Sequence, residues 1–369
     1  MNLRVPGPTP CPEHVLEAMS RDMINHRGPE FADMINRSTH RLKQIFQTDN
    51  DVLILTASGT GAMEAAIVNV LSPGDMVLSV SIGVFGDRLA QIAEAFGACV
   101  VRISTEWGTA ADPEAIRDAL KENSNIKAVL VTHNETSTGV TNNMAKISQV
   151  VKEYDKLLIV DAISSLSSLP FYTDEWQCDV VMSGSQKGYM VPPGLAFVSM
   201  SAKAWDAYKE AKMPRFYWDL GKAKTYLEQG QTPWTPAVSV MYGLDVSLEK
   251  MMEEGLEGIF NRHARLAQKA RDGAKGLGLS LFANEEVASN TVTAINVPES
   301  IDAKNLLKTV QEDCDVVLAG GQGSLSGKIF RIGHLGYVSD DDITIVIDAL
   351  SATLPKIGFK SDRLLSGAN

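Results

Sequence analysis

One lysine and one aspartate each follow an apolar segment, at positions where both could act on the same ligand. Lys187 lies in a turn just after Val180–Met182, and Asp161 ends the run that begins at Leu157. Such runs are typical of buried parallel strands, and open α/β sheets bind ligands beyond the carboxyl ends of these strands. A lysine amine can form a Schiff base with a carbonyl cofactor, and a carboxylate can keep a ring nitrogen of that cofactor protonated. Taken singly, a solvated lysine and a strand-end aspartate are both common, so the other segments decide the interpretation.

Two earlier segments carry groups that suit a phosphate and a flat ring. Ser58, Gly59 and Thr60 lie between the apolar segment Val52–Leu55 and a predicted helix. The free N–H groups and the dipole at a helix start attract anions, so these residues could hold a phosphate. They match no nucleotide-binding loop, and a plain capped turn is the alternative. Phe85, which has glycines on both sides, could stack on a ring or simply pack in the core.

Two later segments carry polar groups that a simple connection would not need. Thr136 belongs to the polar run His133–Gly139, which suits either a binding loop or a capped helix start. Arg331 lies inside a strand predicted at Ile329–Ile332, where an inward-pointing arginine needs an anionic partner. That partner could be a substrate carboxylate held by two parallel hydrogen bonds or a structural acid. The local sequence leaves both pairs of alternatives open.

The composition is that of an acidic globular protein. The 369 residues are 44% hydrophobic and 21% charged, and 34 Lys and Arg against 45 Asp and Glu give a net charge of −11. This balance disfavours nucleic acid and anionic membranes as partners. The sequence shows no apolar run of about 20 residues and no signal peptide, and its four cysteines are scattered. We therefore predict a cytoplasmic protein with buried free thiols and no metal site.

The order of predicted elements indicates two domains. A Pro- and Gly-rich N-terminal segment contains a helix at Glu13–Met23, and apolar strands then alternate with amphipathic helices from Val52 to Ser199. This alternation predicts a mostly parallel α/β sheet flanked by helices. Beyond Pro236, two helices precede a compact unit of strands and helices. We place the boundary near Gly255, so that residues 1–255 form the large domain with its N-terminal segment and residues 256–369 form a small α+β domain.

Together, these features resemble the class V aminotransferases, which are pyridoxal 5'-phosphate (PLP) enzymes of fold type I. Within that family they are most similar to the serine–glyoxylate and alanine–glyoxylate group. The resemblance covers nearly the whole chain and rests on the segments V-P-G-P-T, S-G-T-G-A-M-E-A-A, H-N-E-T-S-T-G-V, G-S-Q-K-G, T-P-W-T-P and F-R-I-G-H-L-G. The segment G-V-F-G-D-R departs from the G-Q-F type of the serine–glyoxylate members. The resemblance implies a large domain with a seven-stranded sheet and a smaller C-terminal domain.

The resemblance also implies roles for the matching residues around the cofactor. Lys187 would carry the cofactor and later move the substrate proton, and Asp161 would pair with the pyridinium nitrogen. The cofactor ring would lie between Phe85 and Ile163. The phosphate would be held by the following residues of one subunit, Ser58, Gly59, Thr60 and Gln186, and by Thr232 and Thr235 of a second subunit.

The substrate side of the site follows from the same resemblance. Arg331 would bind the α-carboxylate, Thr136 would reach the cofactor or the substrate, and His26 and Arg27 would line the neighbouring subunit's site. The implied protein is a homodimer with shared active sites.

The implied reaction is a ping-pong transfer of the amino group of serine or alanine to glyoxylate, which gives glycine and a 2-oxo acid. Aspartate or another donor, and pyruvate as acceptor, remain alternatives. A cysteine desulfurase is disfavoured because the loop Gly320–Gly327 contains no cysteine and Gln186, not a histidine, precedes Lys187. A non-catalytic accessory subunit that keeps the fold is the remaining alternative.

Overall fold

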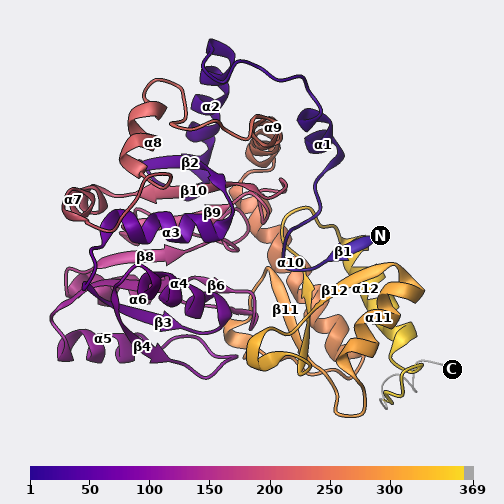
Figure 1. Cartoon of the computed structure of the whole chain (residues 1–369). Coiled ribbons are helices and arrows are strands. Elements are labelled where there is room, and N and C mark those ends of the chain that lie inside the picture. The colour runs from indigo at the N-terminus through magenta and orange to yellow at the C-terminus, as the bar shows by residue number, and fades with distance from the viewer. Residues whose placement is uncertain (361–369) are drawn as a thin grey trace.

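A seven-stranded sheet forms the centre of the larger part of the molecule (Figure 1). The computed structural model describes residues 1–360. The strands lie in the order β2-β10-β9-β8-β5-β3-β4, and β10 runs antiparallel to both of its neighbours while the other pairs are parallel. Their bounds are β2 (Asp51–Ala57), β3 (Met76–Ser81), β4 (Cys99–Ser104), β5 (Ile126–Thr132), β8 (Leu157–Asp161), β9 (Val180–Gly184) and β10 (Gly194–Met200). The predicted seven-stranded, mostly parallel sheet is confirmed.

Helices cover both faces of this sheet because alternate strand residues point to opposite sides. In β8, Leu158 and Val160 belong to one hydrophobic core, and Leu157 and Ile159 belong to the other. The first core is closed by α1 (Glu13–Met19), α2 (Pro29–Phe46), α5 (Pro113–Glu122), α6 (Met144–Glu153) and α9 (Val238–Glu254). The second is closed by α3 (Gly59–Val70), α4 (Val84–Ala95), α7 (Ala202–Glu210) and α8 (Leu220–Leu227).

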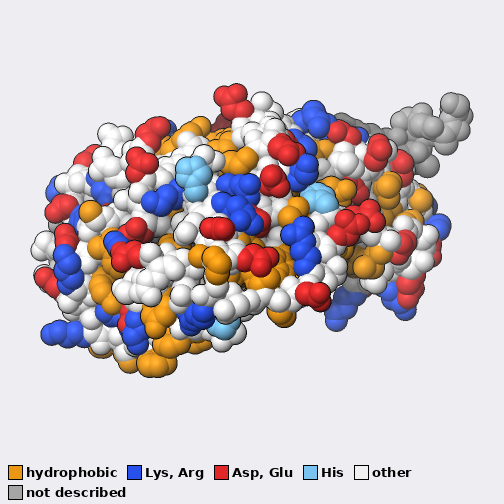
Figure 2. All heavy atoms as spheres, turned by 90° about the horizontal axis from the view of Figure 1, so that it is seen from above, with side chains coloured by type: hydrophobic (Ala, Val, Ile, Leu, Met, Phe, Trp, Pro, Cys, Tyr) orange, Lys and Arg blue, Asp and Glu red, His pale blue; other side chains and the backbone are white. Residues whose placement is uncertain are grey.

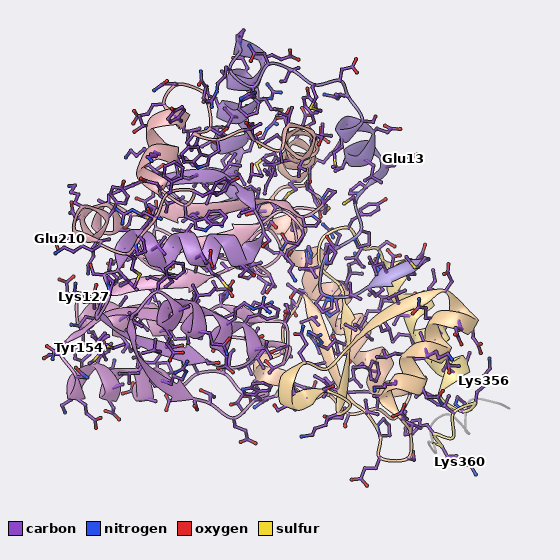
Figure 3. The ribbon with its side chains drawn as sticks, viewed as in Figure 1. Glu13, Lys127, Tyr154, Glu210, Lys356 and Lys360 are labelled. Carbon is purple, nitrogen blue, oxygen red and sulfur yellow. The ribbon has the colours of Figure 1, made fainter. Side chains whose placement is uncertain are left out.

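A second, four-stranded sheet forms the smaller part of the molecule, in the order β1-β12-β13-β11. Its strands are β1 (Asn2–Arg4), β11 (Val292–Asn296), β12 (Val316–Gly320) and β13 (Ile329–Gly333), and it packs with α10 (Leu256–Gly276), α11 (Ala303–Cys314) and α12 (Asp340–Thr353). Short 3-10 turns lie at Glu285–Val287 and Gly323–Leu325. Lys356 and Lys360 mark this part in Figure 3, whereas Lys127, Tyr154 and Glu210 lie at the far side of the large sheet.

The N-terminal region differs from the prediction in three ways. The chain's first strand, β1, pairs with β12 of the small sheet, so the segment before α1 joins both parts of the molecule. Helix α1 ends at Met19, four residues earlier than predicted. The long helix α2 was missed, although Phe31, Met34, Ile35 and Leu42 have helical spacing and are all buried. The predicted domain boundary at Gly255 stays a prediction; α9 ends and α10 begins there.

The structure also bears on two smaller predictions. The polar run at His133–Gly139 does not start a helix: β6 (Asn134–Glu135) pairs with β7 (Val140–Thr141) in a short hairpin, and its role as a binding loop stays a prediction. All four cysteines are free, but Cys178 alone is fully buried, and Cys99 is exposed on an outer strand, so the prediction of buried thiols is wrong for Cys99.

The surface mixes charges of both signs. On the face shown in Figure 2, basic and acidic side chains alternate over most of the described surface. In the described part of the chain, residues 1–360, no helix combines the length and the apolar character needed to cross a membrane.

Candidate active site

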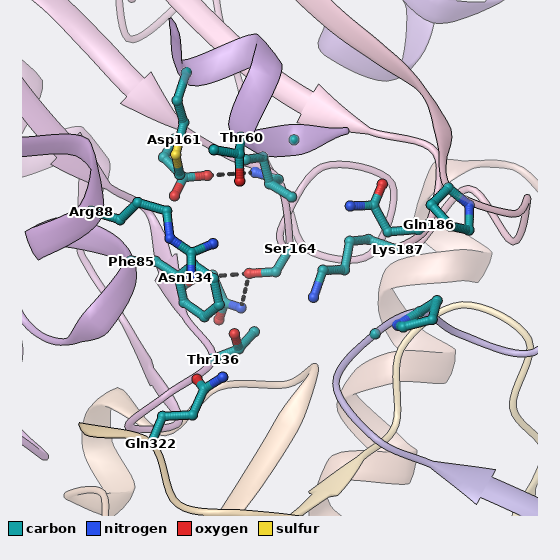
Figure 4. Close-up of a pocket in the computed structure, with 16 residues that line it drawn as sticks. Thr60, Phe85, Arg88, Asn134, Thr136, Asp161, Ser164, Gln186, Lys187 and Gln322 are labelled. Atoms are coloured by element: carbon teal, nitrogen blue, oxygen red, sulfur yellow. Dashed lines mark hydrogen bonds between the residues drawn. The ribbon is translucent and has the colours of Figure 1, made fainter. Parts of the chain in front are cut away.

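A cavity of about 320 Å³ opens beyond the carboxyl ends of β8 and β9, where the polar strand ends meet (Figure 4). Lys187 and Asp161 both line it, and Figure 4 shows their side chains directed toward the same open space. The other lining residues come from both parts of the molecule: Gly7, Pro8, Gly59, Thr60, Met63, Phe85, Arg88, Asn134, Thr136, Ile163, Ser164, Gln186, Pro193 and Gln322. The structure therefore brings the predicted pair into one site.

Asp161 is buried at the end of β8, and its carboxyl group is held by neighbours on two sides. One oxygen accepts the backbone N–H of Ile163 at 3.0 Å, and the other accepts the Thr132 hydroxyl at 3.3 Å. Burial raises the pKa of Asp161 to about 7, because the charged form loses its water, and the Ile163 hydrogen bond offsets part of this rise. A cationic partner inside the cavity would favour the ionised carboxylate.

Lys187 presents its amine to the cavity from the turn that follows β9. The amine donates to the Pro6 carbonyl at 2.5 Å. Burial lowers the pKa of Lys187 to about 8, and the nearby Asp161 counteracts part of this decrease. A much larger fraction of this amine is therefore neutral, and able to attack a carbonyl, than in a solvated lysine.

Phe85 is positioned by a buried carboxylate that sequence reasoning left without a role. One oxygen of Glu135 accepts the backbone N–H groups of Phe85 at 3.0 Å and of Gly86 at 3.1 Å, at the start of α4. Its other oxygen accepts the N–H and the hydroxyl of Ser137. Burial raises the pKa of Glu135, whereas these hydrogen bonds act in the opposite direction. The signal was an acid inside a polar run that follows a core strand.

Arg88 is a second residue that the sequence analysis missed. It lies one helical turn after Phe85, and its guanidinium carbon lies 4.7 Å from the centre of the Phe85 ring. Figure 4 shows the guanidinium reaching into the cavity. The spacing of three residues on α4 puts both side chains on one helix face, which the sequence could have indicated.

Three of the four residues predicted to hold a phosphate within one chain line the cavity. Gly59 and Thr60 do so at the start of α3 and Gln186 in the turn after β9, whereas Ser58 is exposed and is not among the lining residues. The Gln186 side-chain oxygen is buried and has no hydrogen-bond partner within the described residues. A Cβ atom on Gly59 would lie 2.7 Å from Ile163, so the glycine lets the helix start approach the cavity wall.

Arg331 is buried on β13, close to the cavity but not in its lining. Its guanidinium donates to the backbone carbonyls of Gly320 and Thr136, at 2.7 and 2.8 Å. No ion pair joins it to an acid within the described residues, so the structural salt bridge considered above is absent there. Burial lowers the pKa of Arg331 to about 10, although the Glu135 carboxylate is near enough to raise this pKa in part.

The decisive comparison is with known families. The family model described as Aminotransferase class-V matches residues 2–331. The chain belongs to the class-V aminotransferases. Members of this PLP-dependent family have fold type I, which agrees with the two-part α/β architecture described above.

Relatives of this class-V aminotransferase carry different names. The chain is 48% identical to the soluble hydrogenase small subunit of Synechococcus sp., over 97% of this chain and 94% of that protein. It is 38% identical to the L-aspartate–glyoxylate aminotransferase of Paracoccus denitrificans, over 91% and 86% of the two chains. It is 37% identical to the serine–glyoxylate aminotransferase of Methylorubrum extorquens, over 97% and 92%.

The cavity of this class-V aminotransferase fits the family's cofactor. Lys187 offers an amine, Asp161 offers an acid, and Phe85 and Ile163 offer apolar surfaces. The backbone N–H groups at the start of α3, where no side chain caps the helix, can donate to the phosphate end, and the Gln186 amide, which also lines the cavity, can donate through its NH2 group.

Besides Ser58 and Arg331, four predicted residues are absent from the lining of the single chain's cavity: His26, Arg27, Thr232 and Thr235. Arg27 donates to the carbonyl of Thr232 at 2.6 Å, so these two segments of the class-V aminotransferase lie side by side. Thr235 is exposed. Their contact with the site of a second subunit stays a prediction.

Proposed function

We propose that this protein is a PLP-dependent transaminase that moves the amino group of a small L-amino acid, serine or alanine, to glyoxylate. The observation that carries the proposal is that the Lys187 amine and the Asp161 carboxyl group share one cavity with Phe85 and Ile163. The products would be glycine and a 2-oxo acid, released in a ping-pong sequence. One relative is named for aspartate and another for serine, so aspartate is the alternative amino donor.

The residues of the chain divide the chemistry between them. When bound, PLP supplies a carbonyl that combines with amines and a ring that withdraws electrons from the substrate Cα. Asp161 would keep the ring nitrogen protonated, and its buried position would strengthen that pairing. Lys187, once its amine is free, would take the proton from the substrate Cα and return it to the cofactor, for which a pKa of about 8 is well matched. Phe85 and Ile163 would exclude water from the two faces of the ring.

Arg331 would orient the substrate through its α-carboxylate. Three features support this role: the guanidinium is buried, it forms no direct ion pair with an acid among the described residues, and the side-chain oxygen of Gln322, which lines the cavity, lies 3.5 Å from it. A carboxylate entering between Gln322 and Thr136 would give this cation its missing charge partner. Thr136 lines the cavity at the same end.

We also infer that the protein is a homodimer with shared active sites and that it is located in the cytoplasm. Thr232 and Thr235 would contact the phosphate in the partner's site, and His26 with Arg27 would line it. Their shared location outside the cavity of their own chain supports this arrangement.

Glycine production tests the proposed reaction. Purified protein with PLP and glyoxylate should form glycine when serine or alanine is added, and Lys187→Ala should form none. Absence of glycine with serine, alanine and aspartate alike would refute the proposal.

Arg331→Ala should raise KM for both the amino acid and the keto acid, by roughly 30- to 1,000-fold if about 2–4 kcal/mol of binding free energy is lost, while cofactor binding is kept.

A second candidate function rests on one comparison. The 48% identical relative is named a hydrogenase subunit, so a role as an accessory subunit of a larger complex is the alternative. That role does not require Lys187, Asp161 and Arg331 together. A protein that takes up no PLP but co-purifies with a redox enzyme would favour it.

A further inference from the structure

The N-terminal segment Val5–Thr9 lies directly against the lysine of the cavity. The Lys187 amine donates to the Pro6 carbonyl at 2.5 Å. Thr9 forms two more hydrogen bonds to the same turn: its N–H donates to the Gln186 carbonyl at 3.1 Å, and its hydroxyl donates to the Lys187 carbonyl at 2.9 Å. The segment therefore holds both the backbone and the amine of Lys187.

Gly7 stands at the closest approach of this segment to the lysine side chain. A Cβ atom built on Gly7 would lie 2.5 Å from the Lys187 amine nitrogen and 2.8 Å from the adjacent carbon atoms. Its φ of +134° is also a conformation that residues with a side chain rarely adopt. Only glycine lets the chain pass here while the amine reaches Pro6.

The segment is anchored at both ends, so its position is fixed. Upstream, β1 is a strand of the small sheet and pairs with β12. Downstream, α1 packs against α9 beside the large sheet. In between, the segment is packed against β13, where a Cβ atom on Gly333 would clash with the Val5 backbone. Figure 1 shows this stretch crossing from the small sheet to α1.

We propose that Val5–Thr9 is a positioning segment of the active site, in which the Pro6 carbonyl holds the Lys187 amine whenever that amine is not bound to the cofactor. Pro6 and Gly7 are thus positioning residues that act through Lys187. The inference rests on the proposed PLP chemistry and extends it to the Pro- and Gly-rich N-terminal segment, to which the sequence assigned no role in the site. A lysine side chain that is already held in the reactive position loses no further conformational freedom when it captures the cofactor or the substrate proton.

The matched test compares two glycine substitutions. Gly7→Ala places a methyl group against the end of a flexible side chain, so we expect a folded protein with a displaced amine. Gly74→Ala is the control, since Gly74 also has a positive φ, +86°, but its Cβ would meet no atom within 4 Å. Stopped-flow absorbance of PLP capture by cofactor-free protein should show Gly7→Ala slower by roughly 10- to 100-fold, as misplacement of a reacting group by about 1 Å produces. Gly74→Ala should capture PLP at the wild-type rate.

A second variant separates positioning from folding. Thr9→Val removes the hydroxyl that holds the Lys187 carbonyl and keeps the side-chain shape, so capture should slow by roughly fivefold, the effect of one hydrogen bond. Capture at the wild-type rate by both Gly7→Ala and Thr9→Val would overturn the inference.

Failure of the proposed function would be recognised separately. If the wild-type protein captures no PLP, the rate of reductive methylation of Lys187, measured by mass spectrometry on the cofactor-free proteins, decides the inference by itself. A rate altered in Gly7→Ala but not in Gly74→Ala supports the contact with the segment. Equal rates in all three proteins contradict it.

Discussion

At the scale of single residues, the titration of the Lys187 amine predicts how PLP capture depends on pH. The attacking form of Lys187 is the neutral amine, so the capture rate should rise roughly tenfold per pH unit below its pKa of about 8 and level off above it. For a lysine with the ordinary pKa of 10.5, the capture rate would still rise with pH above about pH 8. Stopped-flow absorbance from about pH 6 to about pH 10 measures the profile. A rise that continues to pH 10 would show that burial does not lower this pKa.

Glu135 gives a second prediction at this scale, on stability. Glu135→Ala removes the acceptor of the Phe85 and Gly86 N–H groups and of Ser137, and leaves these groups buried without partners. We expect the free energy of unfolding to fall by about 2–4 kcal/mol. Urea unfolding of the cofactor-free protein measures it, with Glu17→Ala as the control because that side chain is exposed and forms no side-chain hydrogen bond among the described residues. Equal stability of the two variants would contradict the structural role.

The residue scale also shows what sequence could reveal about the site. Lys187, Asp161 and Phe85 were found because each ends or follows an apolar strand, and the sheet order places those ends together. Arg88 was missed although its spacing of three residues from Phe85 on α4 indicated a shared helix face, whereas the role of Glu135 depends on the contact between α4 and the β6–β7 hairpin, which no local pattern encodes. The partners of Arg331, which are two carbonyls, likewise follow from tertiary packing alone.

At the scale of elements, the close packing of the α3 start against the cavity wall predicts a matched pair of glycine effects. Gly59→Ala would push a methyl group into Ile163, 2.7 Å away, and should weaken PLP affinity by roughly tenfold, the equivalent of about 1.4 kcal/mol. Gly276→Ala, near the end of α10, meets no atom within 4 Å and should leave affinity unchanged while raising stability by about 0.5 kcal/mol. Absorbance titration with PLP measures both. Equal affinities would show that this contact is unimportant.

Most elements of the large sheet were predictable, since buried parallel strands read as continuous apolar runs. The missed helix α2 shows a different limit. Its buried residues have helical spacing, but it follows a Pro- and Gly-rich stretch, and no element was predicted between Met23 and Val52. The position of β1 was not predictable, because pairing of Asn2–Arg4 with β12 joins residues more than 300 positions apart in the chain.

At the scale of the whole molecule, shared active sites predict complementation between two inactive variants. In a mixed dimer of Lys187→Ala and Thr235→Ala subunits, one site would contain both native residues, so activity should exceed that of either variant alone. The control mixes Lys187→Ala with Thr60→Ala; Thr60 lines the same cavity as Lys187 in one chain, so no intact site can form. Complementation in neither mixture, after subunit exchange is verified, would argue for independent subunits.

The central claim is that this chain binds PLP at Lys187 and uses it for transamination. The most direct measurement is the visible absorbance spectrum of the purified protein with PLP, followed by titration with serine, alanine and aspartate in turn. We expect a band that depends on Lys187, shifts when an amino acid is added and returns when glyoxylate follows; the donor that acts at the lowest concentration is the preferred one. A colourless protein that cannot be loaded with PLP would contradict the account and favour the accessory-subunit alternative.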